Sequence, residues 1–205
     1  KYLGVTISSD LSWNKHINIT CQKANNTVSF LRRNTYNCPP KVKEMLYKSL
    51  VRPITEYAST VWDPHTQHNI NKIYQVQRRA ARYIKNDFLN TSSVASMLDD
   101  LSWTSLQQRR QLSEVTLMYR IVHHLIAVPA SPYLIQYTHY QLRGHNMPYA
   151  IPRSNTLMHK ASFFPSAIRL WNLLPSEVVA ASTIDSFKSR LQNLFISNNN
   201  IVGFV

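Results

Sequence analysis

The stretch from Asn69 to Lys85 reads NINKIYQVQRRAARYIK, and it decides the fold. Its apolar residues recur every three or four positions: Ile70, Ile73, Val76, Ala80, Tyr83 and Ile84. A helix turns by about 100° per residue, so these side chains share one face. Arg78, Arg82 and Lys85 project from the opposite face, with Arg79 to one side. The stretch predicts a helix with an apolar inner face and a cationic face that is open to solvent.

The same spacing precedes this helix. Between Leu11 and Arg33 it predicts a helix with Lys15 and Arg33 opposite the apolar stripe, which consists of Trp13, Ile17, Cys21, Ala24, Val28 and Leu31. Pro39 and Pro40 begin a second helix, because proline fits the first helical turn, and Pro53 interrupts or kinks it. Its predicted apolar face comprises Met45, Leu46, Leu50, Val51, Ile54, Tyr57, Ala58, Val61 and Trp62.

The rest of the chain predicts more helices, one strand and an irregular region. Further helices are expected near 92–99, 103–125, 163–171 and 184–195. In the helix over 103–125 the apolar face is expected to lie away from Arg109, Arg110 and Arg120 and to comprise Leu112, Val115, Met118, Tyr119, Val122 and Leu125. The β-formers in residues 1–7 predict a strand, and prolines make residues 128–160 irregular. The fold class is therefore mainly α.

Charge is the second strong signal. The formal net charge is +13, from 23 Lys and Arg against 10 Asp and Glu. Residues 1–85 carry +10 of it. Such a field attracts polyanions, and nucleic acid is the commonest of these, whereas simple solubility is the alternative reading.

Several kinds of chemistry lack their residues. Asp99 and Asp100 are the only adjacent acidic pair, so we expect no catalytic carboxylate cluster for two-metal phosphoryl transfer. Three glycines exclude a glycine-rich phosphate loop, and two cysteines, Cys21 and Cys38, exclude a cysteine-rich zinc site. We therefore expect no catalytic residue, metal site or cofactor within this chain. No apolar run is long enough to span a membrane and no signal peptide is visible, so neither a membrane association nor secretion is expected.

Three groups of short motifs follow one another along the chain. The first is KYLGVTI (1–7) with LSWNKHI (11–17). The second is YKSLVRP (47–53), EYA (56–58), VWDP (61–64) and QRRAAR (77–82). The third is LSW (101–103), Arg109-Arg110, SFFP (162–165) and WNLLP (171–175). Together, in this order, these motifs resemble the reverse transcriptases of LINE-type (non-LTR, Jockey-like) retrotransposons.

The resemblance implies a C-terminal fragment of such an enzyme: the end of the palm in residues 1–10, a helical thumb bundle in 11–88 and a helical C-terminal extension in 89–205. The chain begins at Lys1 and has no Met before Met45, which also favours a fragment. The family's metal-binding aspartates belong upstream, in a palm and fingers that the same polyprotein would supply. The parent enzyme would use Mg²⁺ to copy RNA into DNA at a nicked target, in the nucleus or cytoplasm. This fragment alone would not polymerise.

A thumb needs an apolar core and a cationic outer face that follows the backbone of an RNA template and its DNA primer. The candidate contacts are Lys15, Lys23, Arg33, Arg78, Arg79, Arg82 and Lys85. Charge reversal of Arg78, Arg82 and Lys85 is expected to leave folding nearly unchanged. The alternatives are a domesticated helical module that binds nucleic acid or protein, and a non-functional remnant. A separate prediction is that residues 162–175 pack onto the helix over 103–125 through Phe163, Phe164, Ile168, Leu170, Trp171 and Leu174.

Overall fold

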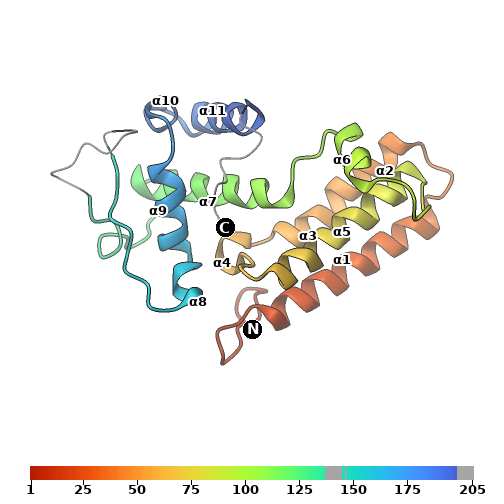
Figure 1. The fold of residues 1–205 in the computed structure, drawn as a ribbon, viewed down its shortest axis with the longest axis horizontal. Helices are drawn as coiled ribbons and strands as arrows, with labels where there is room; N and C mark the ends of the chain where they lie inside the picture. Colours follow the sequence, from red (N-terminus) through yellow and green to blue (C-terminus); the bar gives the residue numbers. More distant parts are fainter. Residues whose placement is uncertain (137–144, 146, 198–205) are drawn as a thin grey trace. The chain divides into compact units, whose positions relative to one another are not determined.

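Helices make up nearly all the regular structure of residues 1–136, 145 and 147–197, which are the residues that the computed structural model describes. The prediction of a mainly α fold is therefore confirmed. The chain divides into two compact units, unit 1 from Lys1 to Ser105 and unit 2 from Leu106 to Val205. Figure 1 traces the helices of both.

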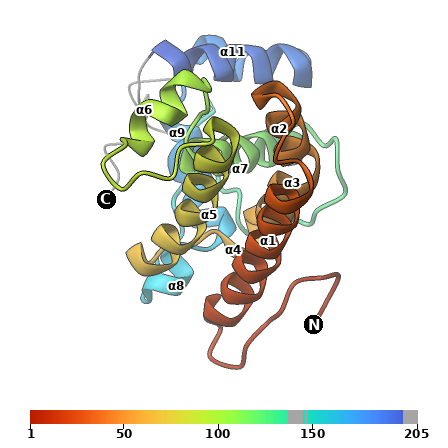
Figure 2. The ribbon, with the colours of Figure 1, turned by 90° about the vertical axis from the view of Figure 1, so that its right-hand side faces the viewer.

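Unit 1 is built on two helices that lie side by side, α1 (Asn14–Asn34) and α5 (Gln67–Lys85). They run parallel, because the paired residue numbers rise together. Asn69 donates to the Asn14 side chain at 2.8 Å, and further along Thr35 shares a hydrogen bond with Tyr83. Most of the predicted inward residues of both helices are buried. Figure 2 shows this pair with α2 and α3 beside it.

The segment that follows α1 differs from its prediction. It comprises α2 (Pro40–Leu46), a π-helical turn η1 (Tyr47–Val51), α3 (Arg52–Glu56) and α4 (Ser59–Trp62). Pro53 has no N–H for the carbonyl of Ser49, and the wide turn lies just before it, with the Arg52 N–H bonding the Tyr47 carbonyl. The residues that turn inward here are four apart.

This wide turn decides which side chains form the core. The buried line is Lys43, Tyr47, Val51, Thr55 and Ser59. The predicted apolar face was right for Val51 and Trp62 and wrong for Met45, Leu50, Tyr57 and Val61, which are exposed. The prediction assumed an uninterrupted α-helical spacing of 3.6 residues, and the wider π-helical turn shifts the phase of that pattern for the residues that follow it.

The strand predicted for residues 1–7 was wrong. Tyr2 and Val5 form an isolated bridge with two backbone hydrogen bonds of 2.8 Å. Leu3 and Gly4 between them have positive φ, which is the geometry of a tight I′ turn. The segment thus pairs with itself and makes no ladder with another strand.

Unit 1 extends beyond the predicted boundary between residues 88 and 89. The helix α6 (Val94–Asp100) packs on α5, where Val94, Met97 and Leu98 form a cluster with Ala81. Trp103 then stacks on Tyr47 at 4.4 Å between ring centroids and donates to the Glu44 carboxylate at 2.9 Å. These contacts hold the chain on the first unit through Ser105.

Unit 2 has a core of aromatic side chains. Its helices are α7 (Leu106–Val122), α8 (Leu157–Lys160), α9 (Phe163–Asn172), α10 (Ser176–Val179) and α11 (Ile184–Ser197). Trp171 of α9 is fully buried, and Tyr119 of α7 stacks on Phe187 of α11 at 4.3 Å. The predicted packing of residues 162–175 onto the long helix is confirmed, since Ile168, Leu170, Trp171 and Leu174 share one core with α7.

The ends of α7 differ from the prediction. It starts at Leu106 and stops at Val122, so Leu125, expected on the inner face, is exposed. Arg110, expected to point outward, is buried. Part of the region predicted as irregular, 137–144 and 146, lies outside the described residues.

Candidate nucleic-acid interface

The two long helices of unit 1 carry cations and no acid. Across α1 and α5 there are nine Lys or Arg residues, and neither helix contains Asp or Glu. The acidic residues of unit 1 all lie in other segments. A helix pair with one sign of charge has a positive field that its own side chains do not cancel.

The predicted residues of α1, here called the α1 row, are spread along the helix: Lys15 and Arg33 share its outer face, and Lys23 lies about 80° to one side of them. Lys15, Lys23 and Arg33 are exposed, and among the described residues none has a carboxylate partner. Lys15 and Arg33 are five full turns apart, so they point the same way along about 27 Å of helix. Polar Gln22 and Asn26 share this face and line an open depression with Lys23.

On α5, Arg78 and Arg79 are exposed but point to different sides. Arg78 packs its guanidinium over the Tyr74 ring, 5.6 Å from the centroid. Arg79 lies on the side of α1 together with Lys72, and the charges of both act on Cys21 of α1. Lys72 donates to the Asn18 side chain at 2.7 Å, which places it in the seam between the two helices.

Arg82 and Lys85 have partners within the chain, which corrects the expectation of a freely solvated cationic face. The Arg82 guanidinium donates to the carbonyls of Asp87, Leu89 and Ser92, at 3.5, 2.7 and 3.3 Å. It therefore ties the loop after α5 to the helix. Lys85 forms a 2.8 Å salt bridge with Asp100 of α6. Reversing these two charges would break contacts that hold unit 1 together.

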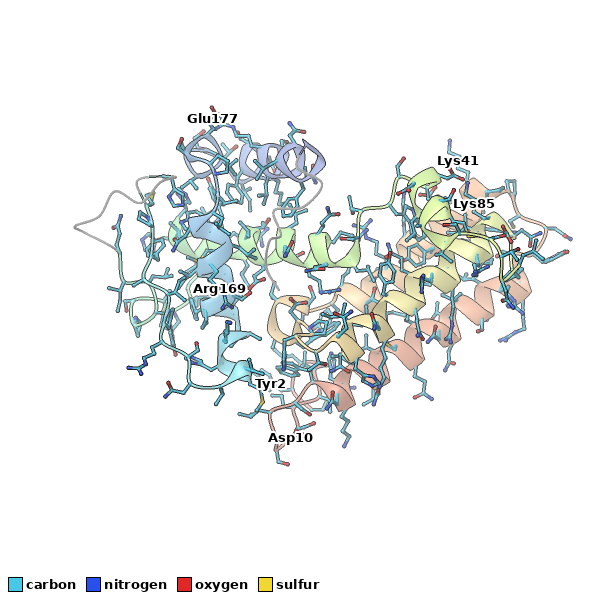
Figure 3. The ribbon with its side chains drawn as sticks, viewed as in Figure 1. Tyr2, Asp10, Lys41, Lys85, Arg169 and Glu177 are labelled. Atoms are coloured by element: carbon cyan, nitrogen blue, oxygen red, sulfur yellow. The ribbon has the colours of Figure 1, made fainter. Side chains whose placement is uncertain are left out.

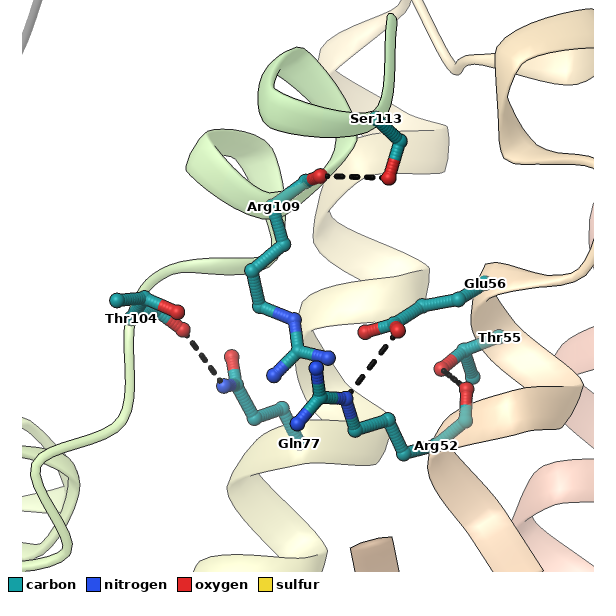
Figure 4. A network of polar contacts seen from close by, with 7 residues as sticks. All are labelled: Arg52, Thr55, Glu56, Gln77, Thr104, Arg109 and Ser113. Atoms are coloured by element: carbon teal, nitrogen blue, oxygen red, sulfur yellow. Dashed lines mark hydrogen bonds and ion pairs between the residues drawn. The ribbon is translucent and has the colours of Figure 1, made fainter. Parts of the chain in front are cut away.

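Other acids of unit 1 are also paired away from the outer face of α1. Glu44 forms a salt bridge with Lys48 at 2.6 Å, and Glu56 forms one with Arg52 at 3.2 Å, which Figure 4 shows. Figure 4 also shows Gln77 of α5 donating to the Thr104 carbonyl at 3.3 Å. None of the salt bridges found among the described residues involves Lys15, Lys23 or Arg33.

Sequence reasoning missed a group of aromatic and basic residues where α1 and α5 end. The Arg32 guanidinium lies over the Phe88 ring at 5.1 Å, and the Lys43 ammonium lies 6.0 Å from the centroid of the Tyr36 ring and 5.5 Å from that of Tyr83. Figure 3 shows Lys41 and Lys85 at this end of unit 1, with Tyr2 and Asp10 at the other. One signal in the sequence could have indicated this group. Tyr36 and Phe88 each follow the end of a predicted helix, close to lysine or arginine residues.

The titratable groups inside unit 1 serve packing. Burial raises the pKa of the Cys21 thiol to about 11, so it stays protonated and unreactive. Burial, assisted by the Lys1 charge, lowers the pKa of His16, whose Nδ1 accepts the Thr6 N–H at 3.2 Å. Both side chains are buried in unit 1.

The described residues also bear on metal binding and on membranes. Among them no three His, Cys, Asp or Glu side chains gather as a metal site. None of the described helices has the length and apolar character to cross a membrane.

The chain matches no protein-family model, no curated protein and no solved structure. The functional proposal therefore rests on the geometry and charge of the chain itself.

Proposed function

We propose that this chain is the C-terminal, non-catalytic part of the RNA-directed DNA polymerase of a LINE-type retrotransposon, and that unit 1 grips the template–primer duplex. Its partners would be the RNA template, the DNA primer and the upstream palm and fingers of the same polyprotein. The Mg²⁺ ions and catalytic aspartates would belong to that upstream part. The chain alone should show no primer extension.

The observation that carries this proposal is the α1 row. It presents Lys15, Lys23 and Arg33 along about 27 Å without a carboxylate partner among the described residues. α5, its parallel neighbour, adds Lys72 and Arg79 and again no acid. A polyphosphate backbone is the ligand whose charge and length suit such a face.

The grip would work through phosphates. Flexible cations on a rigid helix neutralise backbone charge and release counterions, which gives affinity and register but carries no sequence information. The amides of Gln22 and Asn26 on the same face can donate hydrogen bonds to phosphate oxygens. A surface of this kind suits a polymerase that must hold any sequence.

The test compares two variants with the same change in net charge. The first is Lys15→Glu, Lys23→Glu and Arg33→Glu, which reverses the row on α1. The matched control is Arg120→Glu, Arg153→Glu and Lys160→Glu, three exposed cations of unit 2 that come from different segments. Binding to an RNA–DNA duplex is measured against salt, with circular dichroism as the check on folding.

We expect the α1 variant to bind weakly and with a flatter salt dependence, by about 0.9 log units for each phosphate of B-form DNA that is no longer neutralised. The control should bind nearly as the wild type does, with a similar slope. Equal losses of affinity in both variants would show that net charge alone attracts the nucleic acid. Unchanged binding in the α1 variant would overturn the proposal.

A second candidate, a module that binds another protein, is favoured by the outer side of α2 to α4. Exposed residues recur here at intervals of four, and all of them except Ser49 are apolar: Met45, Ser49, Pro53, Tyr57 and Val61. Exposed apolar side chains in a line are typical of protein contacts. If the variant Met45→Ser, Val61→Ser abolished function in the parent enzyme while the α1 variant did not, this candidate would be preferred.

A further inference from the structure

We propose that the end of unit 1 formed by Arg32, Tyr36, Lys43 and Phe88, here called the aromatic end, stacks an unpaired base of the bound nucleic acid. This inference rests on the proposed function and adds a second kind of contact to it. The α1 row would hold phosphates, and the aromatic end would hold a base beyond the duplex.

The positions of the two rings are the first observation. Tyr36 follows the end of α1 by two residues, and Phe88 follows the end of α5 by three. Because α1 and α5 run parallel, their C-terminal ends lie together, and Arg32 of α1 contacts the Phe88 ring. Two loops that are distant in sequence therefore present aromatic rings at the same end of the unit.

The exposure of the rings is the second observation. Tyr36 is 66% exposed and Phe88 is 48% exposed, although large aromatic side chains contribute most when buried. Arg32 covers one side of the Phe88 ring at 5.1 Å. A planar base can therefore stack on the part of the Phe88 ring that Arg32 does not cover, while the guanidinium holds the ring in position.

The positive charge around the rings indicates which kind of ligand would bind there. Lys43 is buried, yet its ammonium lies within 6.0 Å of both the Tyr36 and the Tyr83 ring centroid, so it fixes Tyr36 and makes its surroundings positive. Exposed Arg33 and Lys41 lie next to these residues in sequence and have no carboxylate partner in the described part of the chain. Rings among unpaired cations suit bases attached to phosphates.

An unpaired base fits better than a base pair. Inside a duplex the faces of each base are covered by its neighbours, so only a terminal or single-stranded base can offer a face to Phe88 or Tyr36. Stacking of this kind tolerates any sequence, since every base has a π face. It thus matches a grip that reads no sequence.

The experiment uses the full chain and two RNA–DNA duplexes of equal length, one blunt and one with a short single-stranded overhang. Affinities are measured for the wild type and for Phe88→Ala, Phe88→Leu and Phe88→Trp. The matched control is Leu89→Ala, which removes the adjacent exposed apolar side chain. A second readout places 2-aminopurine in the overhang, where stacking on a ring quenches its fluorescence.

We expect the wild type to bind the overhang duplex about five- to tenfold more tightly than the blunt one, the lower part of the range for one base on one ring. Phe88→Ala and Phe88→Leu should lose this preference and the quenching, because neither has a ring. Phe88→Trp and Leu89→Ala should keep both. Blunt-duplex affinity should change little in all four variants.

The two proposals fail in different ways. Base stacking at the aromatic end would be contradicted if the wild type bound blunt and overhang duplexes equally, or if Phe88→Leu kept the preference for the overhang. Neither result would contradict phosphate binding by the α1 row. If the wild type bound neither duplex, both the proposed duplex binding and the proposed base stacking would be contradicted.

Discussion

Units 1 and 2 have nearly the same net charge, but their exposed cations are arranged differently. Unit 1 has 14 Lys and Arg against 7 Asp and Glu, and unit 2 has 9 against 3. In unit 2, Arg169 and Arg190 donate to the carbonyls of Lys160 and Glu177, and the exposed cations Arg120, Arg153 and Lys160 come from different segments. In unit 1, Lys15, Lys23 and Arg33 form an exposed row. The arrangement of the cations, more than the net charge, distinguishes a candidate interface from a structural role.

The two cores differ as well. Unit 2 packs aromatic rings around Trp171, and the Tyr119 hydroxyl donates to the Ala181 carbonyl at 2.7 Å. In unit 1 the seam between α1 and α5 includes polar contacts, such as Asn14 with Asn69 and Lys72 with Asn18. Unit 2 should therefore depend more on single large side chains, and unit 1 on register and hydrogen bonds.

The largest effect is expected from Trp171→Ala. It removes a fully buried side chain of the unit 2 core, which should cost about 3–5 kcal/mol of unfolding free energy. The control Leu173→Ala, at an exposed position in the same segment, should cost about 0.5 kcal/mol or less. Hydrogen exchange should show reduced protection in α7, α9 and α11 and retained protection in α1 and α5. Equal reduction in both units would mean that they do not have separate cores.

A smaller effect is expected from Arg82→Gln, which separates structural from exposed cations within one helix. Arg82 holds three carbonyls of the loop after α5, and its removal should cost about 1–2 kcal/mol. Arg78→Gln, one turn earlier, should change stability by about 0.5 kcal/mol or less. Urea unfolding measures both. If Arg82→Gln left the unfolding free energy unchanged, the hydrogen bonds of Arg82 would not contribute to the stability of unit 1.

Acidification should weaken unit 1 through His16. Its pKa is lowered from 6.5 in the folded chain, so the unfolded chain takes up the proton first and stability falls as pH drops below about 6.5. Protonation also removes the Nδ1 lone pair that accepts the Thr6 N–H. His123 of unit 2 has a lowered pKa too, so the measurement is hydrogen exchange resolved to α1. His16→Gln should flatten the pH dependence there, and an unchanged slope would contradict this role.

The smallest effect on stability is expected from neutralising the α1 row. Lys15→Gln, Lys23→Gln and Arg33→Gln should shift the unfolding midpoint little, because each side chain is exposed and has no carboxylate partner among the described residues. Thermal unfolding at low and moderate salt checks this. A large drop in the midpoint would show that the row is structural, as Arg82 is.

Much of the helical framework could be predicted from spacing alone. The apolar stripes of α1 and α5 identified Ile17, Leu31, Ile73 and Ile84, all of which are buried. The prediction failed where Pro53 forced a π-helical turn, because the missing N–H changes the spacing on which a periodicity argument depends. It failed again at Leu3 and Gly4, where positive φ turns a β-forming segment back on itself.

The candidate site divides in the same way. Exposure of Lys15, Lys23, Arg33, Arg78 and Arg79 followed from the position of each on its own helix. The role of Arg82 did not, since its three carbonyl partners lie in a loop whose path no helical pattern specifies. The pairing of Lys85 with Asp100 likewise required knowing that α6 returns to α5.

The sequence by itself determined the mainly helical fold, the inward faces of α1 and α5 and the excess of positive charge, because these depend on residue type and local spacing. Only the tertiary structure decided that α1 and α5 run parallel, that unit 1 continues to Ser105 and that Arg32 meets Phe88. The physical reason is that these features are contacts between segments distant in sequence, and loop geometry and core packing determine which segments meet. Periodicity along a single helix carries no information about it.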